Sequence, residues 1–233
     1  MPNLLLHQYP PIPGNVSMSP FCCKVQAALK LRGLDFKTHD TMFAARASPF
    51  AQLPLLEWDG EKLNDSSAIL RALDNRVPSD HPFFPGDPEV NLWEDWADES
   101  LYWYGMYAKF HDDEGWARLG PLVVGLLPLP IRPVAPMIVR RRMRALLHAH
   151  GLLRRDRLNV ETELDRHLDM IDKRLESRPY LCGNFPTAAD CSVVGILAQP
   201  NLAETKLLGK RVALRPRVAE YFKRFRQESK TDV

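Results

Sequence analysis

The first third of the chain alternates short apolar segments with two helical patterns. In chain order, the pattern predicts a strand at 4–6, a helix over 24–33, a strand at 34–39, a short helical or irregular piece at 42–50, a hairpin over 55–63 and a helix that starts near Asp65. The hairpin turn is Asp59-Gly60, a pair that favours tight turns. This order of elements predicts an α/β domain built from a βαβ unit followed by a ββα unit.

After residue 88 no strand pattern remains, and the apolar residues follow helical spacing. Prolines and a glycine mark 78–88 as a linker, so we expect an α/β domain over 1–77 and an all-helical domain over 89–233. The clearest helices of the second domain are an aromatic-rich one over 89–113, a long one carrying Leu164, Leu168, Ile171 and Leu175 on one face, and a final one over 216–228.

The first helix has a distinctive start. Ser19 is a favourable N-cap, Pro20 stands at the first helical position where its missing N–H is not needed, and Gly33 is placed to end the helix. A serine hydroxyl at the positive end of a helix can stabilise an anion, and a thiolate is an anion. Ser19 is therefore a candidate functional residue, although a plain helix cap would need the same side chain.

Four short motifs resemble those of a known family. Ser19-Pro20-Phe21-Cys22 resembles the Cys-Pro-x-Cys of thioredoxin and glutaredoxin folds with serine in place of the first cysteine, as in the serine-type glutathione transferases. Residues 52–56 resemble the segment x-Val-Pro-x-Leu, and residues 64–69 resemble the turn Glu-Ser-x-Ala-Ile of that family. Residues 180–190 resemble its C-terminal signature, in which Thr187 and Asp190 form a capping box. The resemblance implies the glutathione transferase fold, a thioredoxin-like domain followed by a helical bundle.

The resemblance also implies a glutathione site, with glutathione as co-substrate. Ser19 would donate a hydrogen bond to the glutathione thiolate, and the family's proline at position 54 is cis. The remaining implied contacts are the main chain of Leu53 with the glutathione backbone, Gln52 with the glycyl end, and Asp65 and Ser66 with the γ-glutamyl group.

The aromatic-rich helix faces the hydrophobic substrate pocket in this family. Tyr104 or Tyr107 would then line the pocket of a small hydrophobic electrophile, although core packing explains most of the aromatic spacing and is the favoured interpretation. The proline-rich loop at 7–18 precedes Ser19 and could form a wall of the same pocket, or be a surface loop without a role.

Composition restricts the alternatives. A chain of 233 residues with a formal net charge of +2 is an ordinary globular protein without the basic excess of a nucleic-acid binder. The cysteines, Cys22, Cys23, Cys182 and Cys191, form no disulfide framework, and neither they nor the histidines have metal-ligand spacing.

A cytoplasmic location is expected, and the family resemblance implies a homodimer. Because Ser19 replaces the attacking cysteine, a dithiol oxidoreductase is disfavoured, with a monothiol activity of Cys22 as a minor alternative.

The segment 121–157 combines an apolar stretch, interrupted by five prolines, with eight arginines and one acidic residue, Asp156, between residues 132 and 157. The prolines argue against a membrane-spanning helix. Arg140, Arg141, Arg142 and Arg144 could rest on an anionic membrane surface or a partner. The favoured interpretation is an inserted loop and helix whose arginines are solvated or paired with the acidic residues of 94–99 and 112–114.

Within the superfamily, the loop before Ser19, the Trp-rich stretch at 93–103 and the basic segment resemble the failed-axon-connections and metaxin-like branch. The resemblance is compatible with two functions. The first is a glutathione transferase that conjugates the thiolate to a hydrophobic electrophile. The second is a non-catalytic binding protein of the same fold that uses 121–157 to contact a partner or a membrane.

Overall fold

The sheet is small and mixed. A computed structural model describes residues 2–199 and 202–230. It contains β1 (Leu4–Gln8), β2 (Lys37–Asp40), β3 (Leu55–Trp58) and β4 (Glu61–Asn64) in the order β2-β1-β3-β4. β1 is parallel to β2 and antiparallel to β3, with Leu6 opposite Leu56 in the core register. The predicted hairpin is confirmed, and Asp59 and Gly60 adopt the positive φ angles of 50° and 92° that its turn requires.

The second strand begins later than predicted. The alternation of residues 34–39 suggested a strand there, but β2 starts at Lys37 and ends at Asp40. Leu34 and Phe36 are half-buried against the core before the strand begins, so their alternation reflects packing and not strand pairing. All residues of β2 are exposed, as suits an edge strand with polar side chains.

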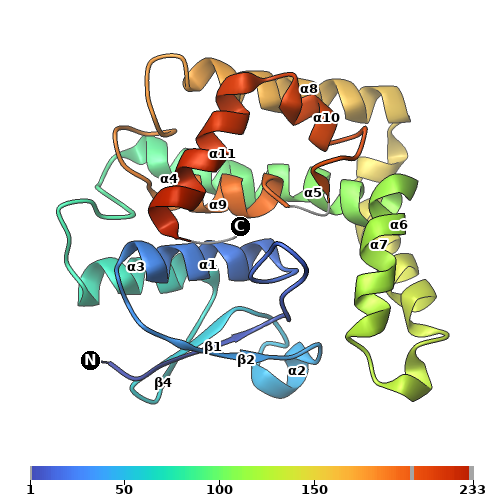
Figure 1. Cartoon of the computed structure of the whole chain (residues 1–233), viewed down its shortest axis with the longest axis horizontal. Helices are drawn as coiled ribbons and strands as arrows, with labels where there is room; N and C mark the ends of the chain where they lie inside the picture. Colours follow the sequence, from blue (N-terminus) through green and yellow to red (C-terminus); the bar gives the residue numbers. More distant parts are fainter. Residues whose placement is uncertain (1, 200–201, 231–233) are drawn as a thin grey trace.

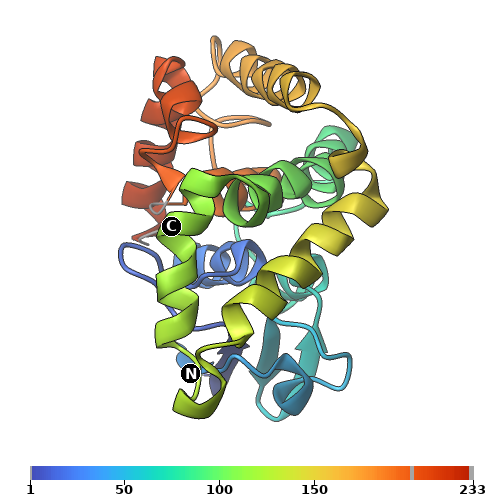
Figure 2. The same ribbon diagram turned by 90° about the vertical axis from the view of Figure 1, so that its right-hand side faces the viewer.

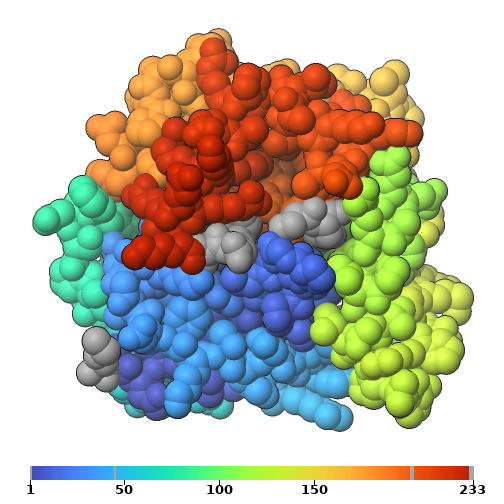
Figure 3. Space-filling model, in the orientation of Figure 1, coloured from blue at the N-terminus to red at the C-terminus, as the bar shows by residue number. Residues whose placement is uncertain are grey.

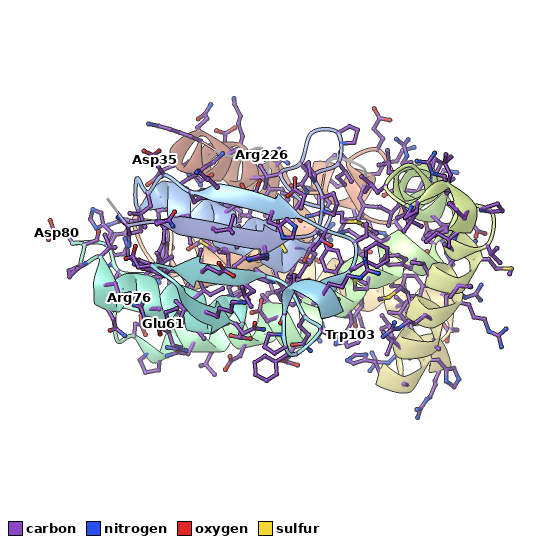
Figure 4. All side chains as sticks on the ribbon, turned by 90° about the horizontal axis from the view of Figure 1, so that it is seen from below. Asp35, Glu61, Arg76, Asp80, Trp103 and Arg226 are labelled. Atoms are coloured by element: carbon purple, nitrogen blue, oxygen red, sulfur yellow. The ribbon has the colours of Figure 1, made fainter. Side chains whose placement is uncertain are left out.

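Three helices complete the α/β domain: α1 (Pro20–Leu31), α2 (Ala44–Ala47) and α3 (Ser66–Arg76). In Figure 1, α1 and α3 lie between the sheet and the helical domain. Arg76 of α3 pairs with Glu61 of β4 at 2.6 Å, at the end of the domain far from α7 (Figure 4). No helix or strand lies in residues 77–87, where the sequence predicts the linker.

The aromatic-rich helix is continuous but contains two π-helical stretches. Its parts are α4 (Pro88–Trp96), η1 (Ala97–Leu101), α5 (Tyr102–Met106) and η2 (Tyr107–His111). It ends two residues before the predicted position because Asp112 leaves helical geometry and caps the next helix, accepting a hydrogen bond from the Gly115 N–H at 3.3 Å. Each π-helical turn rotates the residues after it relative to a regular α-helix.

The other helices are α6 (Asp113–Gly125), α7 (Ala135–His150), α8 (Arg157–Arg174), α9 (Ala188–Leu197), α10 (Gly209–Ala213) and α11 (Pro216–Ser229), with 3-10 turns η3 (Leu129–Ile131) and η4 (Leu152–Arg154). The proline-broken segment is thus divided between the end of α6, η3 and the start of α7. Figure 2 shows α6 and α7 converging at this turn. In the space-filling view of Figure 3, α6 and α7 cover one side of the α/β domain.

Helix α9 joins the two domains. Every residue of α9 is buried, and the helix packs against α1. Gly195 permits this close approach, because a Cβ there would lie 2.8 Å from the carbonyl oxygen of Pro20. The predicted capping box at the start of α9 is confirmed, with the carboxylate of Asp190 accepting hydrogen bonds from the N–H and the hydroxyl of Thr187 at 2.8 and 2.9 Å.

A buried ionic cluster also links the domains. Lys24 of α1 is fully buried, and its ammonium lies 2.6 Å from Glu94 Oε1, 2.7 Å from Asp98 Oδ2 and 3.0 Å from Ser67 Oγ. Glu94 and Asp98 belong to the helical domain, whereas Lys24 and Ser67 belong to the α/β domain. The contact between the domains is therefore both apolar and charged.

Candidate functional site

Ser19 caps α1 as predicted. Its backbone is extended, with φ −95° and ψ 125°, and its Oγ accepts a hydrogen bond from the Cys22 N–H at 3.5 Å. A contact of this length is weak, so the hydroxyl retains the capacity to donate to a second partner. The Ser19 N–H donates to Ser17 Oγ at 3.2 Å, and Ser17 in turn donates to the carbonyl of Tyr9 at 2.7 Å. These bonds tie the residues before the helix to the end of β1.

Cys22 follows one turn later and is a core residue. Its side chain is fully buried, and burial raises the pKa of its thiol to about 11, although hydrogen bonds from Ser19 and Ser17 oppose this shift. At neutral pH the thiol is therefore protonated and a poor nucleophile. This environment gives no support to a monothiol activity of Cys22.

A polar pocket of about 450 Å³ opens at the N-terminus of α1. It is lined by all of the residues that the sequence suggested for glutathione, namely Ser19, Gln52, Leu53, Pro54, Asp65 and Ser66. The peptide bond between Leu53 and Pro54 is cis. The structure thus brings together, from three separate loops, the residues of all three N-terminal motifs.

Asp65 shapes one end of the polar pocket. It is the N-cap of α3, accepts a hydrogen bond from the Ala68 N–H at 2.9 Å and has a φ of 75°, which is rare outside glycine. With this backbone conformation, the first turn of α3 lies at the pocket, and its residues Ser66 and Ser67 line it. The first N–H groups of a helix have no partner within it, so they are available to an anionic group.

The helical domain contributes a group of carboxylates that sequence reasoning did not identify. Asp95, Asp98 and Glu99 line the polar pocket opposite Asp65. Oδ2 of Asp98 binds Lys24, and a hydrogen bond from Ser192 partly offsets the effect of burial on the pKa of the same carboxyl. The Trp-rich stretch around these residues was noted in the sequence, but nothing local indicates that the carboxylates face α3.

An apolar pocket of about 590 Å³ adjoins the polar one. Its walls come from the loop before α1, the segment around α2, the aromatic-rich helix, α6 and α7; its apolar side chains include Met18, Met42, Met106, Phe110, Leu119, Val123, Val139 and Met143. Met18 and Tyr9 belong to the proline-rich loop, and Val123 and Val139 to the proline-broken segment. The proline-rich loop therefore contributes a wall, as the sequence suggested, and the proline-broken segment contributes another.

Tyr104 and Tyr107 are not among the residues that line this pocket; Tyr102 lines it in their place. Tyr102 stacks on Phe21 of α1 at 4.9 Å, whereas Tyr104 packs edge-on against His167 of α8 at 4.8 Å. Tyr107 lies 4.6 Å from the ring of His111. The π-helical stretch η1 rotates this helix, so that positions 102, 106, 109 and 110 face the pocket.

The two pockets meet at Ser19. Both are lined by Tyr9, Ser19, Ala51 and Tyr102. A polar ligand in one pocket and an apolar ligand in the other would consequently touch at the capped end of α1.

Comparison with known families agrees with this geometry. A model of the glutathione S-transferase N-terminal domain matches residues 20–115, and a model of the C-terminal domain matches residues 135–224. The chain belongs to the glutathione transferase superfamily. The fold class predicted from the sequence is therefore confirmed.

Solved structures of transferases have the same fold across almost the whole chain. Glutathione S-transferase III in its apo form is 20% identical, with a TM-score of 0.64, over 97% of this chain and 95% of that one. The beta-etherase LigF from Sphingobium sp. strain SYK-6 is 18% identical, with a TM-score of 0.62, over 96% and 95% of the two chains. Rice GST1 in complex with glutathione is 18% identical, with a TM-score of 0.61, over 97% and 88%.

A curated relative supports the branch that the sequence resembles. "Failed axon connections" of Drosophila melanogaster is 26% identical over 208 residues, which cover 84% of this chain. The chain spans about half, 50%, of the length of that relative.

The described residues form neither a metal cluster nor a membrane-spanning helix. Within residues 2–199 and 202–230, no group of three or more His, Cys, Asp or Glu side chains is arranged to hold a metal ion. In the same part of the chain, no helix is both long and apolar enough to cross a membrane.

Proposed function

We propose that this protein binds glutathione in the polar pocket and conjugates its thiolate to an apolar electrophile held in the adjoining pocket. The observation that carries the proposal is that the two pockets meet at Ser19, at the N-terminus of α1. A nucleophile and an electrophile bound side by side react as an effectively intramolecular pair, which lowers the entropic part of the barrier.

The lining of the polar pocket offers hydroxyl, amide, main-chain and carboxylate groups to the tripeptide. The main chain of Leu53 would pair with the glutathione backbone, and the Gln52 amide would reach its glycyl carboxylate. The hydroxyl of Ser66 and the first N–H groups of α3 would hold the γ-glutamyl carboxylate. The carboxylate of Asp65 would accept a hydrogen bond from the ammonium group.

Ser19 would favour the thiolate form of glutathione. Its hydroxyl is neutral and cannot act as a strong base near neutral pH, but a hydrogen bond that it donates to the sulfur stabilises the anion. The positive end of α1 acts in the same direction. The thiolate would form a sulfur–carbon bond with the electrophile, and the leaving group would depart with its bonding electrons.

Ser66→Ala is expected to weaken glutathione binding roughly tenfold, because a charged carboxylate loses one direct hydrogen bond. Isothermal titration calorimetry of the wild type and the variant would measure this change. Ser79→Ala, which alters an exposed serine of the linker, is the matched control and should bind as the wild type does. Failure of the wild type to bind glutathione at millimolar concentration would refute the proposal.

Ser19→Ala is expected to lower kcat/KM for conjugation roughly 100-fold and to raise the pKa of the thiol of bound glutathione, because the thiolate loses its hydrogen-bond donor. Glutathione affinity should change little, since the tripeptide contacts lie elsewhere in the pocket. Thiolate absorbance against pH and steady-state kinetics are the measurements. Ser19→Thr should restore most of the activity, and Ser17→Ala should leave the thiol pKa unchanged. An unaltered thiol pKa in Ser19→Ala would reduce Ser19 to a helix cap.

The second candidate function is that of a non-catalytic binding protein. It is supported by α7, where Met137 and Ile138 are 67% and 57% exposed beside Arg141 and Arg144. Arg140, by contrast, is paired with Asp113 at 2.7 Å and donates to two carbonyls, in agreement with the favoured interpretation that arginines of this segment pair with the acidic residues of 112–114. Absence of glutathione binding in the calorimetry above would favour this second function.

The resemblance further suggests a homodimer in the cytoplasm, and we retain both as proposals. All four cysteines are free, as is usual for proteins of a reducing compartment.

A further inference from the structure

The two pockets carry opposite charge. The polar pocket is lined by the carboxylates of Asp65, Asp95, Asp98 and Glu99, with no lysine or arginine among its described lining residues. The apolar pocket is lined by the cations Arg46, Lys109 and Arg142, with no aspartate or glutamate among the side chains described there. The cations around the apolar pocket favour a ligand of negative charge over a neutral one.

Lys109 is the deepest of these cations. It lies on η2, is almost fully buried at 2% exposure, and donates to the Met18 carbonyl at 3.2 Å and to Gln199 Oε1 at 3.0 Å. Both acceptors are neutral, and Lys109 forms no ion pair within the part of the chain that the structure describes. A buried cation without a counter-ion is unfavourable, and an anion placed beside it relieves that cost.

The surroundings of Lys109 differ from those of the other buried lysine. Lys24 has the carboxylates of Glu94 and Asp98 within 2.7 Å of its ammonium. Lys109 has no such partner among the described residues and is one of the residues that line the apolar pocket, and burial lowers the pKa of its amine to about 8. Its ammonium form therefore still predominates at neutral pH, so that a cation lines the pocket next to the residue that precedes Ser19.

Arg142 provides a second cation on α7. It is exposed, and it makes no ion pair or hydrogen bond with any residue in 2–199 or 202–230. Its charge acts on Tyr9, which lines both pockets, and partly offsets the effect of burial on the pKa of that phenol. Figure 4 shows many nitrogen-bearing side chains around α6 and α7 on this side of the molecule.

We propose that the apolar pocket selects electrophiles that carry an acidic group, such as a carboxylate on an aromatic or aliphatic body. The carboxylate would pair with Lys109 and Arg142, and the body would contact Met106, Phe110 and Val123. Conjugation of such an acid rests on the proposed function, but binding of an apolar acid to this pocket does not require glutathione.

The first experiment measures binding alone. Calorimetry with decanoate and with decan-1-ol, in the absence of glutathione, compares an acid and a neutral molecule with the same apolar chain. We expect wild-type protein to bind decanoate at least tenfold more tightly than decan-1-ol. Lys109→Met should abolish this preference, and Arg142→Gln should reduce it severalfold. Arg141→Gln is the matched control, since Arg141 neighbours Arg142 but does not line the pocket.

The second experiment measures turnover with 4-chloro-3,5-dinitrobenzoate and its methyl ester, each normalised to its uncatalysed reaction with glutathione. In both reactions the thiolate sulfur bonds to the carbon that carries chlorine, and chloride leaves with the electron pair. We expect the acid to be at least tenfold better in kcat/KM, and Arg142→Gln to reduce that ratio.

The outcomes separate the two proposals. A preference for decanoate in a protein that does not bind glutathione would support the acid pocket and refute the transferase. Equal binding of decanoate and decan-1-ol, or a preference that Arg142→Gln and Lys109→Met both leave unchanged, would overturn the acid pocket while leaving the transferase intact. Because Arg142 is exposed, its variant tests the inference even if Lys109→Met does not fold.

Discussion

Lys24→Met is expected to lower the free energy of unfolding by about 3 to 5 kcal/mol, because it leaves two carboxylates without their cation between the domains. Burial alone would lower the pKa of Lys24, but the carboxylates of Asp98 and Glu94 outweigh it and raise the pKa. Burial beside a second carboxylate raises the pKa of Asp98, since two carboxylates share one ammonium. Removing the ammonium would leave both carboxylates with the cost of burial and without compensation.

Urea unfolding at pH 7 would measure the loss. The triple variant Lys24→Met, Glu94→Gln, Asp98→Asn should recover part of it, because no charge is then buried without a partner. Lys62→Met is the matched control, since the Lys62 side chain is 57% exposed and its pair with Glu57 is 3.4 Å long. Its effect should lie within about 0.5 kcal/mol. A loss below 1 kcal/mol in Lys24→Met would mean that the buried cluster does not stabilise the domain contact.

Asp190→Ala is expected to lower the free energy of unfolding by about 3 kcal/mol or more, because four donors lose their acceptor in a dry environment. The carboxylate accepts from the N–H groups of Leu181 and Thr187 at 2.9 and 2.8 Å, and from the hydroxyls of Thr187 and Tyr221, both at 2.9 Å. It therefore fixes the start of α9, the loop before it and α11 at one point.

Asp190→Asn retains one oxygen and should be less destabilising than the alanine variant. Asp87→Ala serves as a comparison, because Asp87 caps α4 through a single exposed hydrogen bond of 2.9 Å to the Glu89 N–H. The loss there should be about 1 kcal/mol. Equal losses in Asp87→Ala and Asp190→Ala would contradict the special role assigned to the buried carboxylate.

Features encoded by neighbouring residues could be predicted from the sequence. The cap at Ser19, the hairpin turn at Asp59 and the capping box of Thr187 each depend on side chains that act on backbone within a few residues. Such chemistry is largely independent of the rest of the chain. The N-terminal part of the site is built on these local features, and all of its predicted residues line one pocket.

Features that depend on distant contacts could not be predicted. The π-helical stretch and the stacking of Tyr102 on Phe21 accompany the orientation of the aromatic-rich helix, so the family resemblance alone pointed to Tyr104 and Tyr107 where Tyr102 lines the pocket. Nothing in the residues around Lys24 and Lys109 indicates that these side chains are buried. The two carboxylates that compensate the burial of Lys24 lie 70 and 74 residues away in the sequence. Gln199, which accepts a hydrogen bond from Lys109, lies 90 residues from it.

The burial of Cys22, Cys23 and Cys191, and the partial burial of Cys182, bear on how the protein would withstand the reagents that it handles. Burial raises the pKa of Cys22 to about 11 and those of Cys23 and Cys182 to about 12, and it raises the pKa of Cys191 as well. At neutral pH each side chain is therefore a thiol of low reactivity. An electrophile in the apolar pocket would meet a thiolate only on glutathione. The protein is thereby protected from alkylating itself, even though Cys22 and Cys23 lie in the first turn of the helix that Ser19 caps.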